Sequence, residues 1–391
     1  MRILLVCESS HIYESGGRVV RYITKFLKEK NNQVKLVVLS EQRDDFDLNC
    51  FYKENDVVFL PLRKNLRFRI GNLLYKTKEL KRFREVLNEF SPEIVHFASF
   101  DSGKPPQFIS DAKKFGAKVV LQPWTMQFYC AQGFGFRDGE KCTLCANGNF
   151  LNALTKKCVT YKGIPSLIEK KILHNRALEA DVLLSSNTEL DKILLKYGIK
   201  EDKISRFPIP FDCGFLKQKE ENEEDYFIFY GQANSHKGLN VLIKIFELLP
   251  EQKLKIYPLS NLPENTIKNS NIEIINGVNW SNGLEDAILN SKAVLMPSLW
   301  STSTEYALCE ALLMKKPVVV FNVGVHRDIF KNKFNAMVIE SNDIISFAKA
   351  IVELDQDEKL RKIIGENGFK TLLAINTPDN VYSKLLFAYK Q

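Results

Sequence analysis

Short apolar runs rich in β-branched residues alternate with helical patterns along most of the chain. Between the first two runs, Val20, Ile23, Phe26 and Leu27 recur at the spacing of one helix face. Strands that are apolar throughout and separated by helices predict a parallel sheet covered by helices on both faces. In the first half of the sequence the predicted strands are RILLVC (2–7), QVKLVVL (33–39), DVVFL (56–60), EIVHF (93–97), AKVVLQ (117–122) and DVLLSS (181–186).

The alternation stops at a charged segment and then restarts. LKQKEENEED (216–225) has no apolar period and is typical of an exposed linker. A chain of 391 residues is also longer than one typical domain. We therefore predict an α/β protein of two doubly wound domains, residues 1–212 and 213–391, with a cleft between them and a last helix at about 377–391 that packs on either one. The later strands are YFIFYG (226–231), KLKIYP (253–258), IEIING (272–277), AVLMP (293–297), PVVVF (317–321) and NAMVIE (335–340).

Composition and charge exclude several classes of protein. No apolar run approaches the roughly 20 residues that span a bilayer. The N-terminal MRILLVCESS lacks the features of a signal peptide, so we expect a cytoplasmic protein. The net charge of +8 suits an anionic ligand or a membrane surface but is too small by itself to predict nucleic-acid binding.

One basic helical stretch, residues 64–91, is interleaved with Leu, Tyr and Phe. Such a helix can lie on an anionic leaflet, which would place the protein peripherally at the inner face of a membrane. The alternative is a helix whose apolar stripe packs on the sheet, and this stretch alone favours that alternative.

Two loops of the second half predict a ligand site. One strand ends in Gly231, and after a polar turn Lys237 and Gly238 open a helix. The strand at 293–297 runs into hydroxyl-bearing residues and a helix that starts near Glu305. Both loops follow the carboxyl ends of strands in one predicted sheet, where α/β proteins bind ligands. Glycine lets a backbone approach a ligand, and a lysine beside a helix N-terminus offers a point charge to phosphate.

The helix after the second loop predicts which part of a ligand each end would bind. The backbone N–H groups from Thr304 to Ala307, which include those of Glu305 and Tyr306, would face an anion. Glu310 lies about one and a half turns further on, where a carboxylate suits a pair of sugar hydroxyls. The pattern therefore predicts a nucleotide, with its ribose on Glu310 and its diphosphate on Lys237 and the helix amides.

With these motifs the sequence resembles the family 4 retaining glycosyltransferases of GT-B fold over nearly its whole length. The resemblance implies two Rossmann-like domains that transfer a sugar from a nucleotide donor with retained anomeric configuration and without an essential metal. It also implies that the glycine-rich loop contacts the donor, that the lysine binds diphosphate, and that the last helix returns to the N-terminal domain. The segments that carry it are Gly16-Gly17, VHF (95–97), RFPIPFD (206–212), YGQ…HKG (230–238), PSLW…EALLMKKPVVV (297–320) and NVGVHRDIF (322–330).

The sequence departs from the family pattern at the donor sugar and in the first domain. Where the family has an acidic residue eight positions before Glu310, this chain has Thr302, and where the family often has an Arg it has the neutral Gln232. Trp124 replaces a common His. Either Trp124 stacks on a ring and Thr302 binds a donor hydroxyl, or these residues are structural. His96, at a strand end, is a candidate for the acceptor side, although a histidine there is more often part of the core.

Four cysteines form a separate pattern. Cys142 and Cys145 make a CxxC pair, and Cys130 and Cys158 flank it at eleven and twelve residues. This spacing predicts a structural zinc site of four thiolates. An iron–sulfur cluster, a redox disulfide and four unligated thiols are the alternatives. Relatives in the family carry a cysteine-rich insert here, which implies a structural loop near the acceptor.

The activity expected is transfer of a hexose-type residue to a surface polysaccharide or lipid-linked glycan. Lys237 and Glu310 are the candidate catalytic residues, and the alternative is a catalytically impaired homologue that binds another transferase. The candidate donor-binding residues are Gly16, Gly17, Gly231, Gln232, Lys237, Thr302, Thr304, Glu305, Tyr306, Ala307 and Glu310.

Overall fold

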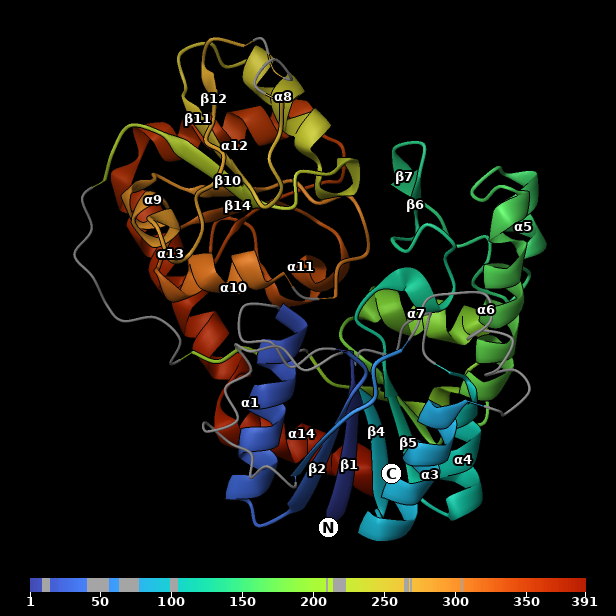
Figure 1. The fold of residues 1–391 in the computed structure, drawn as a ribbon. Coiled ribbons are helices and arrows are strands. Elements are labelled where there is room, and N and C mark those ends of the chain that lie inside the picture. The colour runs from blue at the N-terminus through green and yellow to red at the C-terminus, as the bar shows by residue number, and fades with distance from the viewer. Residues whose placement is uncertain are drawn as a thin grey trace. The chain divides into compact units, whose positions relative to one another are not determined.

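The computed structural model divides into two compact units, and each is described by itself (Figure 1). The first contains Met1–Gly135, Thr143–Asp212 and Pro378–Gln391, and the second contains Phe136–Cys142 and Cys213–Thr377. The structure describes residues 1–8, 15–40, 56–62, 77–98, 105–208, 210–213, 223–263, 267, 269–303 and 305–391.

The first unit is built on a parallel sheet, seven-stranded within the described residues, in the order β3-β2-β1-β4-β5-β8-β9. β1, β4 and β5 are mostly apolar and, apart from Arg2 and Lys118 at their first positions, buried, as expected for strands covered on both faces. The strands are β1 (Arg2–Cys7), β2 (Gln33–Val38), β3 (Val57–Phe59), β4 (Ile94–Ala98), β5 (Lys118–Gln122), β8 (Val182–Ser185) and β9 (Ile204–Arg206).

Helices cover both faces of this sheet. α1 and α14 lie on one face and α3 and α4 on the other, because the strand order runs outwards in both directions from β1 (Figure 1). The helices are α1 (Ser15–Glu29), α3 (Lys78–Phe90), α4 (Gln107–Phe115), α5 (Leu151–Thr155), α6 (Ile164–Ala177), α7 (Thr188–Tyr197) and α14 (Pro378–Lys390), with short 3-10 turns η3 (Met126–Phe128), η4 (Tyr161–Gly163) and η5 (Glu201–Lys203).

The last helix, α14, packs on the sheet of the first unit. The Tyr389 hydroxyl lies 2.9 Å from Nδ1 of His96 in β4, and Lys118 Nζ donates to the Tyr389 carbonyl over 2.9 Å. Val381 and Leu385 are buried on the same helix. The chain therefore returns to its first unit after completing the second.

The second unit has a parallel sheet, six-stranded within the described residues, in the order β12-β11-β10-β13-β14-β15. Its strands are β10 (Phe227–Gly231), β11 (Leu254–Pro258), β12 (Ile272–Ile274), β13 (Val294–Met296), β14 (Val318–Phe321) and β15 (Met337–Ile339). Its helices are α8 (Leu239–Glu247), α9 (Leu284–Asn290), α10 (Tyr306–Leu313), α11 (Gly324–Ile329), α12 (Ile344–Gln356) and α13 (Glu358–Ile375), with the 3-10 turn η6 (Ser235–Lys237). A short antiparallel hairpin, β6 (Phe136–Arg137) with β7 (Glu140–Lys141), also belongs to this unit, and Phe136 packs against its core.

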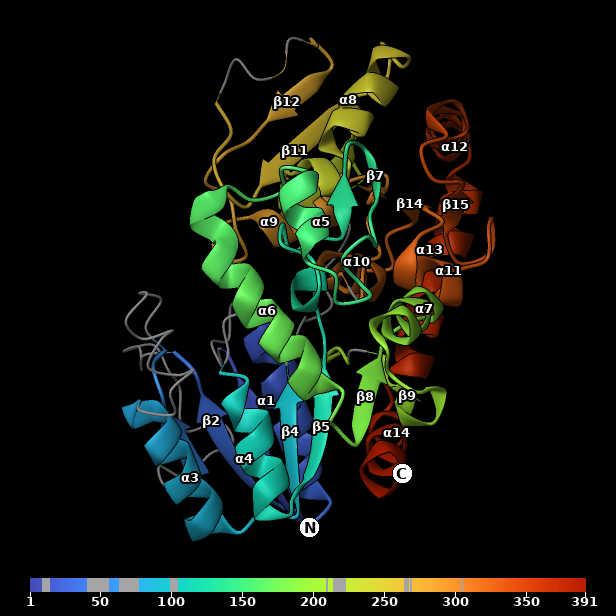
Figure 2. The same cartoon turned by 90° about the vertical axis from the view of Figure 1, so that its right-hand side faces the viewer.

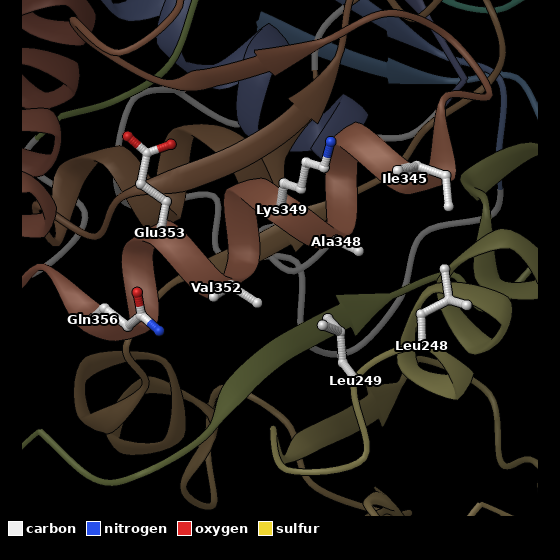
Figure 3. Close-up of a pocket in the computed structure, with 8 residues that line it drawn as sticks. All are labelled: Leu248, Leu249, Ile345, Ala348, Lys349, Val352, Glu353 and Gln356. Atoms are coloured by element: carbon white, nitrogen blue, oxygen red, sulfur yellow. The ribbon is translucent and has the colours of Figure 1, made fainter.

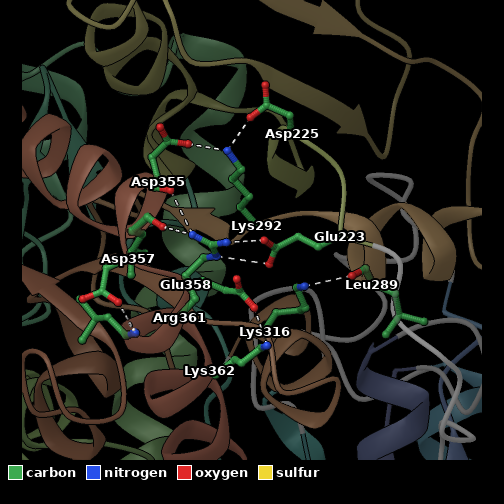
Figure 4. A network of polar contacts seen from close by, with 12 residues as sticks. Glu223, Asp225, Leu289, Lys292, Lys316, Asp355, Asp357, Glu358, Arg361 and Lys362 are labelled. Carbon is green, nitrogen blue, oxygen red and sulfur yellow. Dashed lines mark hydrogen bonds and ion pairs between the residues drawn. The ribbon is translucent and has the colours of Figure 1, made fainter.

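A polar network stabilises one side of the second unit (Figure 4). Arg361 on α13 is 6% exposed and forms an ion pair with Glu223, which precedes β10. Lys292, before β13, bridges Asp225 and Asp355. Burying the Arg361 charge costs little here because Glu223 pairs with it and the carbonyls of the preceding helix accept further hydrogen bonds.

The predicted strands and the two-domain α/β fold are confirmed, but the sequence did not predict β9 or the β6–β7 hairpin. In the basic stretch, α3 buries Leu80, Phe83, Val86 and Leu87, so its apolar stripe packs inside the unit. Residues 64–76 of that stretch and residues 216–222 of the predicted linker lie outside the described residues. Within the described part of the chain, the helices are too short or too polar to cross a membrane.

Candidate functional site

Two loops of the second unit meet because their strands are neighbours. β10 pairs with β13, and each strand is followed by a polar loop and a helix, η6 and α8 in one case and α10 in the other. Parallel neighbours end at the same edge of a sheet, so the loops lie side by side. The backbone N–H of Leu299 donates to the carbonyl of His236 over 3.0 Å and joins them directly.

Gly238 permits this close approach. Its φ is +81°, and a Cβ at this position would lie 1.9 Å from the carbonyl oxygen of Pro297. A side chain cannot occupy that space without moving the backbone of the second loop. Of the two neighbouring residues, Gly238 therefore has a structural role, which is to let the second loop approach, and Lys237 supplies the charged group of the site.

Lys237, whose side chain is 20% exposed, forms an ion pair with the buried Glu305. Its Nζ lies 2.8 Å from Glu305 Oε1, and the hydroxyl of Ser298 donates to the same oxygen. Glu305 is 5% exposed and is the N-cap residue of α10, where the helix dipole favours an anion. The sequence predicted a ligand phosphate at this helix end, and in the structure the Glu305 carboxylate contacts Lys237 there.

The electrostatics keep Glu305 ionised. Burial alone would raise the pKa of its carboxyl. The Lys237 ammonium, followed by His326 and by the hydrogen bonds from Lys237 and Ser298, outweighs burial and lowers the pKa to about 2. The group is thus a carboxylate at neutral pH, and Lys237 has its counter-charge within the protein.

His326 on α11 faces the other oxygen of this carboxylate. The side chain is fully buried, its Nε2 lies 3.8 Å from Glu305 Oε2, and its Nδ1 lies 3.1 Å from the carbonyl oxygen of Phe321. A carbonyl only accepts hydrogen bonds, so Nδ1 carries the proton. Burial lowers the pKa of His326, although the nearby Glu305 charge opposes this, and we assign a neutral imidazole.

Aromatic rings pack beside the pair. Lys237 Nζ lies 5.3 Å from the centre of the Trp300 ring, which is 7% exposed, and the His236 ring stands edge-on to Trp300 at 5.4 Å. Burial, and then the charge of Lys237, lower the pKa of His236 to about 4. Electrostatic attraction is stronger in such a poorly hydrated setting than at an open surface.

Thr302, where the family has an acid, is a packed residue of the loop. Its side chain is fully buried, and its carbonyl accepts a hydrogen bond from the N–H of Val325 over 3.0 Å. A Cβ at Gly324 would lie 2.4 Å from that carbonyl oxygen. In this conformation the Thr302 hydroxyl does not reach solvent, which favours a structural role over contact with a donor sugar.

The remaining predicted donor residues lie at the same edge of the sheet. Glu310 is 4% exposed in the second turn of α10, and Ala307 accepts a hydrogen bond from the Tyr230 hydroxyl of β10. Gly231 has a φ of +108° with open space around its Cβ position, and Gln232 beside it is exposed. Tyr306 is half-buried at the start of α10, and Thr304 lies outside the described residues.

Two predicted residues of the first unit come together. Gly16, in the first turn of α1, lies against Trp124, so that a Cβ at Gly16 would be 2.7 Å from Cζ3 of the indole. Gly17 follows and is buried. The structure thus shows one physical reason for a glycine at position 16, which is the space that Trp124 occupies.

His96 does not line an open acceptor site. It is fully buried in β4, pairs with Tyr389 of α14, and burial lowers its pKa to about 3. A neutral histidine that anchors the last helix explains its position at the strand end. The acceptor assignment is corrected to a core role.

The cysteine segment does not fit the predicted zinc site. Cys130, Cys142, Cys145 and Cys158 are all described and all free of disulfides. Within the described residues no group of three or more His, Cys, Asp or Glu side chains is placed to hold a metal ion. We therefore derive no step through a metal.

An apolar pocket lies elsewhere in the second unit (Figure 3). Leu248 and Leu249 at the end of α8 and Ile345, Ala348 and Val352 of α12 line a groove of about 450 Å³. None of the site residues lines it, so we assign it no part in the chemistry.

Sequence reasoning did not assign roles to Ser298 and Trp300. Both lie in the PSLW segment, and only the pairing of β10 with β13 brings them to Lys237. The available signal was their position directly after a buried strand, at the edge where ligands bind.

Residues 215–371 match the family model described as Glycosyl transferases group 1. The sequence is 33% identical over 88 residues, 22% of each chain, to a UDP-Gal:alpha-D-GlcNAc-diphosphoundecaprenol alpha-1,3-galactosyltransferase of Escherichia coli. It is 23% identical over 322 residues to an uncharacterized glycosyltransferase of Methanocaldococcus jannaschii, over 78% of this chain and 84% of that protein.

The structure is similar to that of Anabaena HepE in complex with UDP, with a TM-score of 0.68 at 10% identity over the full length of both chains. Such a likeness concerns the fold, which is GT-B. Residues 215–371 are therefore assigned to a group 1 glycosyltransferase domain, and the fold of the whole chain is that of the GT-B glycosyltransferases.

Proposed function

We propose that the protein transfers a sugar, with retention, from a nucleotide-sugar donor to a surface-polysaccharide or lipid-linked glycan acceptor. The observation that carries this proposal is the Lys237–Glu305 pair at the N-terminus of α10. It combines a cation, helix amides and a water-poor wall, the combination that stabilises a leaving diphosphate. The names of two comparison proteins support a nucleotide-sugar donor, since one uses UDP-Gal and the other was solved with UDP.

In this proposal Lys237 exchanges partners. The diphosphate of the donor displaces Glu305 from the ammonium, and the α10 amides contact the same phosphates. The bond between the anomeric carbon and the diphosphate oxygen breaks, and a bond to the acceptor oxygen forms on the same face of the sugar. The acceptor proton passes to the leaving diphosphate. Glu310 accepts hydrogen bonds from the ribose hydroxyls, and no metal takes part.

The first experiment is a thermal-shift screen against UDP, GDP, ADP and CMP. A ligand at a hundred times its dissociation constant adds about 2.7 kcal/mol to the free energy of unfolding. With the best nucleotide and its sugars, Lys237→Ala should lower transfer or donor hydrolysis about a hundredfold or more, since it removes the charge at the leaving group. Lys244→Ala, on the exposed face of α8, is the matched control. NMR of the product's anomeric proton tests retention, and wild-type turnover by Lys237→Ala would refute the site.

The buried Thr302 supports one alternative, a catalytically impaired homologue that binds another transferase. That alternative predicts binding of a nucleotide without turnover of any of its sugars. Transfer or hydrolysis by the purified chain, lost in Lys237→Ala, would exclude it.

A further inference from the structure

Residues 144–171 of the first unit expose an unusual number of large apolar side chains. Fourteen large hydrophobic residues of the described chain are exposed, and five of them fall in this one short segment. Isolated exposed apolar residues are normal, but a concentration of them marks an interaction surface. The five are Leu144, Leu151, Tyr161, Ile164 and Ile168, of which Leu151 is 68% and Tyr161 75% exposed.

α6 is the long helix of this segment (Figure 2). It shows this most clearly because its buried and its exposed apolar residues lie on two different faces. Leu167, Leu173 and Ala177 are buried and pack inside the unit. Ile164 and Ile168 are four residues apart on the opposite side, one turn above the other, and both are exposed. The buried residues of α6 anchor the helix in the fold. Ile164 and Ile168 are exposed and take no part in that packing.

The charges of the segment are almost all positive. Residues 144–171 contain five lysines and a single acidic residue, Glu169. Lys156, Lys157, Lys162 and Lys171 are exposed, whereas Lys170 is buried and donates to the carbonyl of Gln127. Lys171 follows Ile164 and Ile168 at positions i+7 and i+3, on the same face of α6.

We propose that this segment is a peripheral membrane-binding surface that takes anionic phospholipid bilayers. The exposed Leu, Ile and Tyr side chains enter the boundary between headgroups and acyl chains, and the exposed lysines contact lipid phosphates. Charge complementarity selects this occupant, since apolar residues interleaved with lysines match an anionic interface. A second copy of this chain would bring the same lysines together and repel. The inference goes beyond sugar transfer and does not depend on it.

Binding of the full chain to vesicles tests the proposal. We expect flotation with vesicles of phosphatidylglycerol and phosphatidylcholine in equal parts, little with phosphatidylcholine alone, and weakening by salt. Leu151→Ser/Tyr161→Ser/Ile168→Ser should weaken binding at least about tenfold. Lys156→Glu/Lys157→Glu/Lys162→Glu should weaken it by roughly fivefold for each lysine lost.

Matched controls change the same chemistry elsewhere in the first unit. Leu195→Ser/Phe387→Ser alters two exposed apolar residues outside the segment, and Lys114→Glu/Lys192→Glu/Lys200→Glu makes the same charge change. Both should bind vesicles like the wild type, and an unchanged melting temperature shows that each variant folds. Lys237→Ala should also bind normally, which separates this proposal from the proposed catalysis.

Three results would overturn the proposal. The first is a wild type that does not float with anionic vesicles. The second is vesicle binding by both triple variants of the segment that equals that of their controls. The third is a dimer in sedimentation velocity that the serine variant dissolves while vesicle binding stays absent, which would assign the surface to self-association.

Discussion

Lys237 Nζ and Glu305 Oε1 lie 2.8 Å apart, although 68 residues separate them in the sequence. One residue follows β10 and the other caps α10, so the pair spans the two loops of the candidate site. The ammonium that the proposal assigns to a diphosphate is therefore already neutralised by a carboxylate of the chain. A donor has to compete with Glu305 for Lys237.

Glu305→Gln should strengthen nucleoside-diphosphate binding while weakening the fold. The amide keeps the shape of the side chain but leaves the Lys237 charge to the ligand, so affinity should rise about tenfold. Losing the charged partner of a buried pair should cost about 1–3 kcal/mol of unfolding free energy. Isothermal titration and chemical denaturation measure the two effects.

Glu366→Gln is the control for this change, because Glu366 pairs with Lys315 on an exposed surface. It should leave both affinity and stability as in the wild type. A Glu305→Gln variant that binds the nucleotide more weakly would show that Glu305 contacts the donor itself and does not compete with it.

Glu310→Gln should reduce discrimination between a ribonucleotide and its 2′-deoxy analogue. A carboxylate accepts charge-assisted hydrogen bonds from ribose hydroxyls, and the neutral amide accepts weaker ones, so the preference should fall by about tenfold. Titration of the best-binding nucleoside diphosphate and its analogue against both proteins measures it. If the variant discriminates between the two nucleotides as strongly as the wild type, Glu310 does not bind the ribose.

Gly238→Ala and Gly277→Ala should differ sharply in stability. Both glycines have a similar positive φ, +81° and +78°. Each substitution should therefore lower the unfolding free energy by about 1–2 kcal/mol, because alanine disfavours the left-handed backbone. Only at Gly238 does the new Cβ meet a carbonyl oxygen, that of Pro297 at 1.9 Å. We therefore expect Gly238→Ala to cost several kcal/mol more, measured by denaturant unfolding. If both variants lose the same unfolding free energy, the backbone of the second loop moves aside for the new Cβ without a measurable loss of stability.

The stability of the protein should fall as the pH drops from about 6.5 towards 4. Burial lowers the pKa of His174 and His236 to about 4 and of His96 to about 3 from an ordinary 6.5. The unfolded chain therefore binds protons that the folded chain does not, and each histidine contributes a slope of up to about 1.4 kcal/mol for each pH unit in that window. Denaturant unfolding at pH 7.5 and pH 5 measures it.

The Glu305 carboxyl has a pKa of about 2 in the folded protein and 4.5 as its ordinary value, so it lowers the stability only below about pH 4.5. The stability difference between pH 7.5 and pH 5 therefore reports on the histidines. His236→Asn, which cannot take up the proton, should flatten part of the slope. A stability that is equal at pH 7.5 and pH 5 would contradict the burial of these imidazoles.

The strands and the edge of the sheet that carries the site were predictable because they depend on local patterns. ILLVC (3–7) and VVVF (318–321) are apolar at every position, which suits a strand covered on both faces, and both lie in strands of the structure. A polar loop after such a strand and before a helix is a ligand position in α/β folds, which led to Lys237 and Glu310.

Contacts between distant residues were not predictable, because sequence spacing does not say which side chains a sheet brings together. The sequence predicted that the backbone N–H of Glu305 faces an anion. In the tertiary structure its side-chain carboxylate forms an ion pair with Lys237. His96 was a candidate for the acceptor, and it pairs with Tyr389 from the end of the chain. The spacing of Cys130, Cys142, Cys145 and Cys158 suits four zinc ligands, but the described structure does not gather them into a metal site.

The sequence by itself determined the alternation of strands and helices and the loops where chemistry is expected, since burial on both faces selects residue types position by position. Only the tertiary structure decided the partners of the charged groups. Pairing a buried charge depends on which strand ends are neighbours, and here the adjacency of β10 and β13 decides that Lys237 meets Glu305.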